Sequence, residues 1–365
     1  MRTRARHSPT TDALVIGGGI VGAASALALA RRGVGVVLVE QGSLEAAAGS
    51  SSGTARIIAP AAYPDDSYLE MGIRALERWR ELERAAGEPL IETTGVLSRG
   101  GFAERQLPAL QAAGLEARLV SVEQARDGLG IRAGDGSPLL LQPDAGVIRA
   151  AIALRALLRL SQAAGARIHE RETVRSIVDG GDLLDVVSAT GRRWSCSVAI
   201  VAAGPWTSAI AARAGIGLSL RVSKQSVAYF DLPDRRAKPT ALIDYDGDEP
   251  YALWDPERGL KAALHARGPE VDPSELGLEA DPAAVERITG WVRARWPALT
   301  SGPVRTEACL YTNTPDERFV LERRGRIVIA SACNGQGFQL APETGERVAD
   351  LASQVTARVP AGQRG

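Results

Sequence analysis

A glycine-rich turn between an apolar run and an alanine-rich stretch constrains the fold of this chain more than any other feature. The apolar residues 13–16 lead into Gly17-Gly18-Gly19-Ile20-Val21-Gly22, and an Ala/Leu-rich stretch follows as far as Arg32. A second apolar run, residues 36–39, is followed by Glu40. Continuous apolar runs are typical of buried parallel strands, so the segment predicts a strand, a helix and a second strand in one βαβ unit.

Three of these glycines, Gly17, Gly19 and Gly22, have the spacing GxGxxG. In a turn between a strand and a helix, glycines at this spacing let the backbone approach a pyrophosphate at the positive N-terminus of the helix. Glu40 lies where the acid that hydrogen-bonds a ribose hydroxyl is expected, and an acid there disfavours NADP. We therefore expect a dinucleotide site, since a glycine turn for packing alone would not require Glu40. The motif does not separate NAD from FAD.

Two later apolar runs predict further buried strands. Residues 197–204 and 326–330 are both rich in valine, isoleucine and alanine. The second run is followed by Gly335, Gly337 and a helix that opens at Pro342, where a proline suits the first helical turn. These pieces extend the predicted α/β unit toward the end of the chain.

The intervening regions have other patterns. Apolar residues at helical spacing predict helices at 69–86 and 152–164. Strand-like alternation with turn residues predicts a mostly antiparallel sheet from residues 218–232, 241–266 and 304–314. A chain of 365 residues exceeds the usual length of one compact domain, so we expect two. The expected boundaries give a discontinuous dinucleotide domain of residues 10–85, 145–217 and 315–360, and a substrate domain of residues 86–144 and 218–314.

Charge and cysteine content restrict the partners. Positive and negative residues balance at 43 each without a long block of one sign, which argues against nucleic acid or an acidic membrane surface as a partner. No apolar run approaches the roughly 20 residues of a membrane span, and the basic, polar start lacks a signal-peptide core. Cys196, Cys309 and Cys333 form no CxxC pair, so we expect a reducing, cytoplasmic compartment, no cysteine-rich metal site and a small-molecule partner.

Five blocks of the sequence carry a family resemblance. They are residues 49–58 (Gly-Ser-Ser-Ser-Gly-Thr-Ala-Arg-Ile-Ile), Ala203-Gly204-Pro205-Trp206, Gly259-Leu260-Lys261 with His265, Cys309-Leu310-Tyr311-Thr312, and Gly335-Gln336-Gly337-Phe338. In this order they resemble the family of monomeric sarcosine oxidase and N-methyl amino acid oxidases, which are D-amino-acid-oxidase-like flavoproteins. The family's first block reads Gly-Ser-His-His-Gly-Asp-Thr-Arg-Ile-Ile and runs past the flavin ring. The resemblance spans nearly the whole chain.

The resemblance implies an enzyme that oxidises CH–NH bonds with FAD. The implied fold is a Rossmann-like FAD-binding domain with a second, mostly antiparallel β-sheet domain for the substrate. The implied partners are an amine and O2, with H2O2 as a product, and the implied assembly is a monomer or a small homo-oligomer. Besides the glycine motif and Glu40, the implied FAD contacts are Ser50, Arg56, Val174, Gly204, Trp206, Cys309, Gly335, Gly337 and Gln339.

Cys309 lies where family members link a cysteine sulfur to the 8α-methyl of FAD, so the resemblance implies a covalent cofactor. The alternative is a small buried hydrophobic residue, the commonest role of a free cysteine. Tyr311 lies two residues later, and a strand would point both side chains to one face. Tyr311 could therefore border the flavin or the substrate.

In residues 260–265, period-two geometry places Lys261, Ala263 and His265 on one strand face. A solvated face of an amphipathic strand is the alternative. The resemblance implies that Lys261 lies against the flavin and assists the reaction with oxygen, and that His265 lies nearer the substrate with Tyr251 as a neighbour. Arg56 could be a surface arginine, but its block implies a position near the flavin ring.

Three positions depart from the family pattern. The family holds a substrate carboxylate with an arginine and a lysine, where this chain has Ala59 and Gln339, and Gln336 replaces a histidine. Neither alanine nor glutamine can replace bidentate recognition by arginine. We therefore expect an oxidase of a secondary or cyclic amine other than sarcosine. The alternatives are an amine dehydrogenase with another electron acceptor and a non-catalytic flavoprotein. We assign no chemistry to the remaining candidates, Cys196, Cys333, His7 and His169.

Overall fold

The computed structural model describes residues 10–44, 49–134, 136–234, 236–245, 247–266, 268–275, 279–332 and 334–356. The chain forms two compact units. The first contains residues 1–51, 154–221 and 312–365, and the second contains residues 52–153 and 222–311. The second unit thus includes residues 52–85 and 145–153, which the sequence analysis grouped with the dinucleotide domain. The reason is strand pairing, because β3 (Ala55–Ile58) pairs antiparallel with β8 (Gly146–Arg149).

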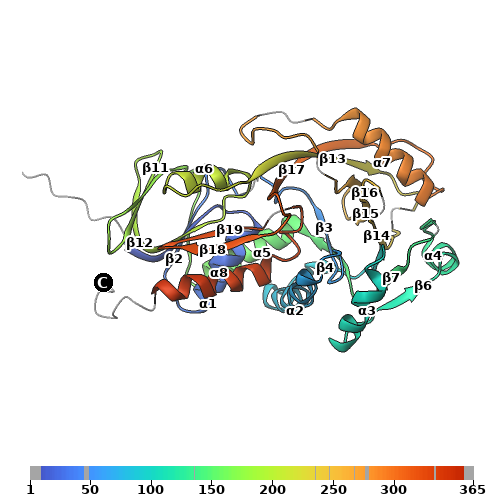
Figure 1. The fold of residues 1–365 in the computed structure, drawn as a ribbon, viewed down its shortest axis with the longest axis horizontal. Helices are drawn as coiled ribbons and strands as arrows, with labels where there is room; N and C mark the ends of the chain where they lie inside the picture. The colour runs from blue at the N-terminus through green and yellow to red at the C-terminus, as the bar shows by residue number, and fades with distance from the viewer. Residues whose placement is uncertain are drawn as a thin grey trace, which may run out of the picture. The chain divides into compact units, whose positions relative to one another are not determined.

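The first unit is built on a sheet whose centre is parallel (Figure 1). Its parallel pairs join β1 with β2 and β12, β2 with β9, and β12 with β19. Antiparallel pairs add β10 and β11 beside β12, and β18 beside β19. The strands are β1 (Thr10–Ile16), β2 (Val36–Val39), β9 (Arg167–His169), β10 (Val174–Asp179), β11 (Leu184–Ser188), β12 (Arg193–Val201), β18 (Val320–Arg324) and β19 (Ile327–Ser331). The predicted βαβ unit and the two later buried strands are confirmed.

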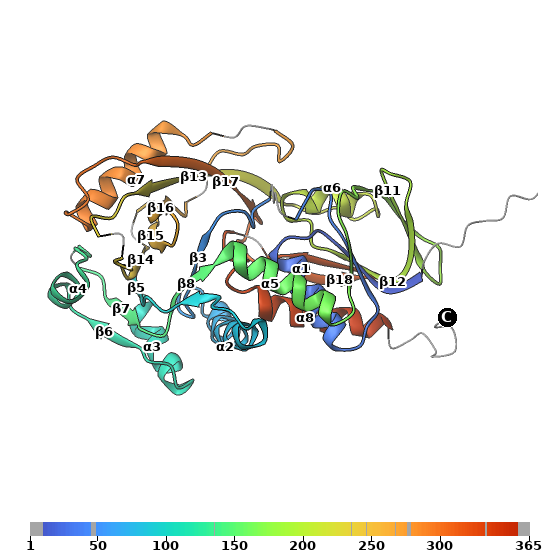
Figure 2. The same cartoon turned by 180° about the vertical axis from the view of Figure 1, so that it is seen from behind.

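Helices α1 (Ile20–Arg31) and α8 (Ala341–Thr356) lie side by side in this unit (Figures 1 and 2). A Cβ atom on Gly345 of α8 would lie 2.6 Å from the carbonyl oxygen of Ala24 in α1, so the two backbones approach closely. This contact explains why α1 consists largely of alanine and is buried around most of its circumference. The helix predicted to open at Pro342 begins one residue earlier.

The other helical segments of the first unit are α5 (Ala150–Ala163, in this unit from Leu154), η2 (Gly204–Trp206) and α6 (Thr207–Ala212). Ile210 and Ala211 of α6 pack on the sheet with residues such as Leu14, Val39 and Val201. The sheet is therefore covered by α6 in addition to the α1 and α8 pair, and its apolar strands are buried.

The second unit contains an eight-stranded sheet with the order β17-β13-β16-β15-β14-β5-β7-β6. Its strands are β5 (Val96–Arg99), β6 (Arg118–Val120), β7 (Leu139–Gln142), β13 (Arg221–Phe230), β14 (Ala241–Asp244), β15 (Pro250–Asp255), β16 (Gly259–Leu264) and β17 (Arg305–Asn313). The registered pairs are antiparallel, except that β14 runs parallel to β5. The prediction of a mostly antiparallel second sheet is confirmed.

Helix α7 (Pro282–Arg295) packs on one face of this sheet (Figure 2). Leu260, Ala262 and Leu264 of β16 form a core there with Ile288 and Val292 of the helix. Ala263 instead packs with Cys309 on the other face. The alternation predicted for β16 is therefore present, with its apolar side turned to α7.

A three-stranded sheet, β3-β8-β4, completes the strands of the second unit, with β4 at Ile91–Glu92. Its remaining helices are η1 (Asp66–Tyr68), α2 (Leu69–Ala86), α3 (Ala103–Ala112) and α4 (Val122–Leu129). The helix predicted at residues 69–86 thus has the expected bounds. No helix in the described part of the chain is both long and apolar enough to span a bilayer.

Candidate active site

The glycine turn between β1 and α1 has no room for side chains. Gly17 has a φ of +112°, and a Cβ atom there would lie 2.4 Å from the carbonyl oxygen of Ala202. A Cβ on Gly22 would lie 1.9 Å from the carbonyl oxygen of Gly17. Gly19 is the N-cap of α1. The three predicted glycines therefore form a tight turn at the N-terminus of a buried helix, the geometry that accepts a pyrophosphate.

Glu40 is tied to the same turn. One carboxylate oxygen accepts from the backbone N–H of Gly18 at 2.7 Å, and the other accepts from that of Gly42 at 2.8 Å. The carboxylate is thus held directly beside the glycine turn. Among the described residues, this is where a ribose hydroxyl of a dinucleotide is expected to bind.

Ser51 contributes to this site, although the sequence analysis named its neighbour Ser50. The Ser51 hydroxyl oxygen accepts from the backbone N–H of Ile20 at 3.0 Å. A glycine N-cap has no side chain to satisfy the first N–H groups of a helix, so Gly19 requires an acceptor from elsewhere. That requirement is the sequence signal that could have identified a nearby serine.

The other expected cofactor contacts in the first unit are also placed. Val174 begins β10 and is 2% exposed, and Gly204 has a φ of +52° at the start of η2. The Trp206 ring lies 3.6 Å from the position of a Cβ on Gly49.

After β19, Gly335 has a φ of +73°, and a Cβ on Gly337 would lie 2.3 Å from the carbonyl oxygen of Ala332. Gln339 is 5% exposed. Cys333 lies outside the described residues. The glycines therefore shape a second tight turn, which precedes α8.

Three buried polar side chains near this second turn have atoms without hydrogen-bond partners in the described part of the chain. They are both amide atoms of Asn334, the Oε1 of Gln336 and the hydroxyl of Thr312. Asn334 is 4% exposed and its backbone N–H donates to the carbonyl of Thr312 at 2.8 Å. Buried polar atoms almost always have partners, so this cluster fits a bound polar ligand such as a flavin. The sequence analysis assigned no role to Asn334, or to Thr312, which lies in one of the blocks that carry the resemblance.

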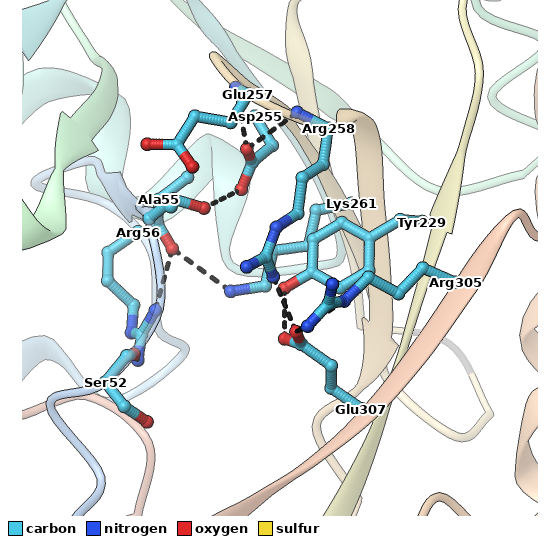
Figure 3. Close-up of polar contacts among 11 residues, drawn as sticks. Ser52, Ala55, Arg56, Tyr229, Asp255, Glu257, Arg258, Lys261, Arg305 and Glu307 are labelled. Carbon is cyan, nitrogen blue, oxygen red and sulfur yellow. Dashed lines mark hydrogen bonds and ion pairs between the residues drawn. The ribbon is translucent and has the colours of Figure 1, made fainter. Parts of the chain in front are cut away.

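Lys261 is a buried cation of the second unit and lies among the polar contacts drawn in Figure 3. It is 6% exposed, and its Nζ donates to the carbonyl oxygen of Ala55 at 3.1 Å. The Nη1 of Arg56 donates to the same oxygen at 2.8 Å. Two cations predicted from separate blocks thus meet at one carbonyl, which brings Lys261 and Arg56 together.

Burial first, and then the positive charge of Arg56, lower the pKa of Lys261 to about 7. Cys309, Asp255 and Glu307 act in the opposite direction. An ordinary lysine holds its proton throughout the neutral range. Lys261 can therefore exchange a proton near neutral pH.

Cys309 lies on the same sheet face. Its half-buried side chain packs against a cluster of Val227, Tyr229 and Ala263, with Tyr251 beside it. Burial raises the pKa of its thiol, whereas the charges of Lys261 and Arg56 lower it. It is a free thiol whose pKa is raised overall by burial, and the two neighbouring cations limit that rise.

Tyr63, Tyr251, His265 and Tyr311 form what we call the aromatic cluster. The side chains of Tyr251 and Tyr311 hydrogen-bond to each other, and burial raises the pKa of both phenols, which therefore stay neutral. The His265 ring centre is 5.7 Å from that of Tyr311 and 6.1 Å from that of Tyr63. Tyr251, the expected neighbour of His265, hydrogen-bonds to Tyr311, whose ring contacts that of His265.

The surroundings of Ala59 are apolar. This residue is 1% exposed and lies in a core with Val96, Val147 and Leu253, against which Tyr63 and Tyr251 also pack. The position where the family has an arginine is thus enclosed by hydrocarbon and phenol groups.

Arg258 is another arginine of the second unit that could bind a substrate carboxylate if its charge were unmatched. Its guanidinium donates to Glu307 at 2.6 Å and lies 5.0 Å from the centre of the Tyr229 ring (Figure 3). Tyr229 also donates to Glu307, at 2.8 Å. The charge of Arg258 is therefore matched by a carboxylate within its own unit.

Of the residues to which the sequence analysis assigned no chemistry, two lie in the first unit and make ordinary polar or core contacts. His169 contacts Arg192 at 2.9 Å, and Cys196 is fully buried in the first unit, where burial raises its pKa to about 12. His7 lies outside the described residues.

Comparison with known proteins places these features in a family. The sequence profile described as "FAD dependent oxidoreductase" matches residues 12–351. Peroxisomal sarcosine oxidase of Homo sapiens is 33% identical, over 94% of this chain and 93% of that protein. N-methyl-L-tryptophan oxidase of Salmonella arizonae is 27% identical, over 94% of this chain and 95% of that protein.

A solved structure has the same fold. NikD, described as an unusual amino acid oxidase essential for nikkomycin biosynthesis, superposes in its open form with a TM-score of 0.79 at 26% sequence identity. The match covers 94% of each chain.

Proposed function

The chain belongs to the family of FAD-dependent oxidoreductases, and from this premise we propose that it oxidises a secondary or cyclic amine, with O2 as the electron acceptor and H2O2 as a product. The relatives named for sarcosine and N-methyl-L-tryptophan share oxidation of a C–N bond, which supports this chemistry. The observation that carries the proposal is buried Lys261, which shares the Ala55 carbonyl with Arg56 beside a free cysteine.

FAD, when bound, supplies the acceptor for the hydride that leaves the carbon next to the amine nitrogen. In the first unit, the glycine turn and the N-terminus of α1 would hold its pyrophosphate, and Glu40 its ribose. Asn334, Gln336 and Thr312 offer unpaired polar atoms for further hydrogen bonds. These groups would hold the cofactor from the first unit.

Lys261 would serve the reaction with oxygen. Electron transfer to O2 creates negative charge, and a fixed ammonium in a dry site stabilises that charge more than it could in water. Arg56 adds a second positive charge at the same carbonyl. The pair therefore favours an oxidase over a dehydrogenase that passes electrons to another acceptor.

We propose that Cys309 forms a thioether with the 8α carbon of FAD. The C–S bond replaces the S–H bond and one C–H bond, two protons are released, and O2 takes up the two electrons. This bond requires the thiol to lose its proton, and the neighbouring charges of Lys261 and Arg56 oppose the effect of burial, which raises the pKa of that thiol. A covalent link would prevent loss of the cofactor.

The substrate is proposed to lack a small carboxylate of the sarcosine type. Ala59 lies among apolar groups, Gln339 carries no charge, and Arg258 is matched by Glu307. The aromatic cluster offers phenol and imidazole surfaces against which a larger amine could pack. We therefore propose an amine whose binding depends on apolar contact and hydrogen bonds to neutral groups.

An anaerobic screen tests the function. Holoprotein is mixed with N-methylamines, cyclic amines, sarcosine and pipecolate without oxygen, and flavin absorbance is followed. Bleaching by at least one amine, then rapid recovery with stoichiometric H2O2 when oxygen is admitted, is expected. Bleaching without rapid recovery would identify a dehydrogenase. No bleaching by any amine, in protein that dithionite reduces normally, would support the non-catalytic alternative.

A further inference from the structure

A buried carboxylate holds the segment next to the Ala55 carbonyl. Asp255, the last residue of β15, is 1% exposed. One of its oxygens accepts from the Thr54 hydroxyl, and the other accepts from the backbone N–H groups of Glu257 at 3.0 Å and Arg258 at 3.1 Å (Figure 3). Both oxygens are therefore fixed, one of them by the tight turn between β15 and β16.

The bond from Thr54 connects this carboxylate to the cations. Thr54 directly precedes Ala55, whose carbonyl oxygen accepts from Lys261 at 3.1 Å and from Arg56 at 2.8 Å. The backbone carbonyl of Thr54 also accepts, from the N–H of Ala150 at 2.8 Å. Since only a few backbone dihedrals separate the two residues, a fixed Thr54 restricts the Ala55 carbonyl as well.

The groups around Lys261 come from four strands. On β3, Arg56 is a like charge, which lowers the pKa of Lys261. On β17, Glu307 and Cys309 raise it, and on β15 Asp255 does the same. The β13 residue opposite Lys261 is Tyr229, a phenol whose own pKa is raised by burial and which is therefore neutral.

The two carboxylates in this group differ in how their charges are matched. Glu307 pairs with Arg258 and with Arg305, each at 2.6 Å. Within the described part of the chain, Asp255 accepts only from neutral donors, the hydroxyl of Thr54 and two backbone N–H groups. The charge of Asp255 is thus not offset by an ion pair, and it raises the pKa of Lys261.

We propose that Asp255, acting through Thr54, is a positioning residue for Lys261. It holds the carbonyl that the ammonium contacts, and its charge favours the cationic form of that group. The inference rests on the proposed role of Lys261 in the reaction with oxygen. The candidate site then contains an anion, Asp255, and the hydroxyl of Thr54 in addition to its cations, its thiol and its aromatic groups.

Direct titration of Lys261 tests the charge effect without any substrate. The chain has three lysines, Lys224, Lys238 and Lys261, so protein labelled with 13C at lysine Cε gives three side-chain signals. Asp255→Asn should lower the titration midpoint of Lys261 by about one pH unit, since an opposite charge nearby shifts a pKa by roughly 1–3 units. The other two midpoints should not move.

A matched control removes a carboxylate that does not contact Thr54. Glu257 is exposed and lies two residues along the same turn, so Glu257→Gln removes the same charge without removing that hydrogen bond. In Glu257→Gln, the titration midpoint of Lys261 should stay within a few tenths of a pH unit of the wild-type value. The Lys261 signal itself is identified by its loss in Lys261→Met.

The reaction with oxygen tests the positional effect. Protein reduced by dithionite is mixed with O2, so that no amine is needed. With the Lys261 midpoint lowered by about one unit from about 7, and a neutral site about tenfold slower than the charged one, Asp255→Asn should react about threefold more slowly at pH 7 and about twofold more slowly at pH 6 and pH 8. Thr54→Val keeps the charge and removes the hydrogen bond, so it should slow the reaction at all of these pH values, whereas Thr54→Ser should resemble the wild type.

An unchanged Lys261 midpoint in folded Asp255→Asn would overturn the inference. If that variant does not fold, the Thr54 pair decides, and equal oxygen rates for Thr54→Val and Thr54→Ser would overturn it. Slow reaction of the wild type with oxygen, unaffected by Lys261→Met, would instead refute the proposed oxidase. The lysine titration would still report on Asp255 in that case, so the two failures are distinguishable.

Discussion

Replacement of Lys261 by methionine should remove the pH dependence of the reaction with oxygen. The pKa of Lys261 is lowered to about 7, so roughly nine-tenths of the side chain is protonated at pH 6 and roughly one-tenth at pH 8. The ammonium is the form that stabilises negative charge on oxygen. The wild-type rate should therefore fall about fivefold as pH rises from 6 to 8, toward the rate of the neutral site, and it should be recovered on return to pH 6.

The size of the rate loss in Lys261→Met follows from the buried position of the Lys261 ammonium. Two unit charges about 4 Å apart interact by about 4 kcal/mol at an effective dielectric constant of 20. If a third of this energy is realised as charge develops, about 1.4 kcal/mol is lost without the ammonium, which is tenfold in rate. Lys261→Met should thus react at least about tenfold more slowly than the wild type at pH 6, and the two should converge above pH 8.

Stopped-flow reoxidation of dithionite-reduced protein measures these rates directly. Anaerobic reduction by an amine serves as the control, because loss of the oxygen effect alone should leave it within a few-fold of the wild type. A wild-type profile that is flat between pH 6 and 8, or a Lys261→Met profile with the same slope, would refute the reasoning. Equal slowing of both half-reactions would assign Lys261 to the structure or the substrate.

Three further outcomes are expected. Acid denaturation of the wild type should leave the yellow chromophore on the polypeptide, whereas Cys309→Ala should release FAD; free FAD from the wild type would contradict the thioether. Sarcosine should reduce the wild-type flavin slowly, and Ala59→Arg with Gln339→Lys should gain at least about tenfold, since each charge-assisted hydrogen bond contributes roughly 1.5–3 kcal/mol; rapid wild-type turnover would show that these positions do not decide binding. Gly22→Val should lower the free energy of unfolding by about 3 kcal/mol or more in thermal unfolding, because its Cβ would lie 1.9 Å from the Gly17 carbonyl oxygen.

The features of the fold that could be predicted from the sequence are the local ones. Apolar runs predicted the parallel strands, and the period-two pattern of β16 predicted which side chains share the face of Lys261. These features depend on neighbours in the chain, where periodicity is visible. The parallel pairing of β14 with β5 was not visible, because it joins residues such as Leu242 and Leu97 that are far apart in sequence.

The same limit applies to the candidate site. Blocks that resemble a family predicted Lys261, Arg56 and Cys309, but nothing local predicts that Thr54 donates to Asp255, 201 residues later. Asn334 likewise has no distinguishing pattern in the sequence, and it is notable because its buried side-chain amide has no partner among the residues that the structure describes. Polar contacts between distant segments are decided by packing, which a pattern within one segment does not contain.

The close contact of α1 with α8 has a consequence for how the protein is made. Strand β1 pairs with β12, and β12 pairs with β19, so the first unit joins segments from the beginning, middle and end of the chain. Non-local contacts of this kind form slowly, because the chain loses the entropy of closing a long loop before the contacts that stabilise the loop can form. During synthesis, the alanine-rich α1 lacks its partner until α8 has left the ribosome. The nascent chain is therefore expected to depend on chaperones until its last helix emerges, and removal of residues 341–356 should leave a protein that aggregates rather than a smaller folded one.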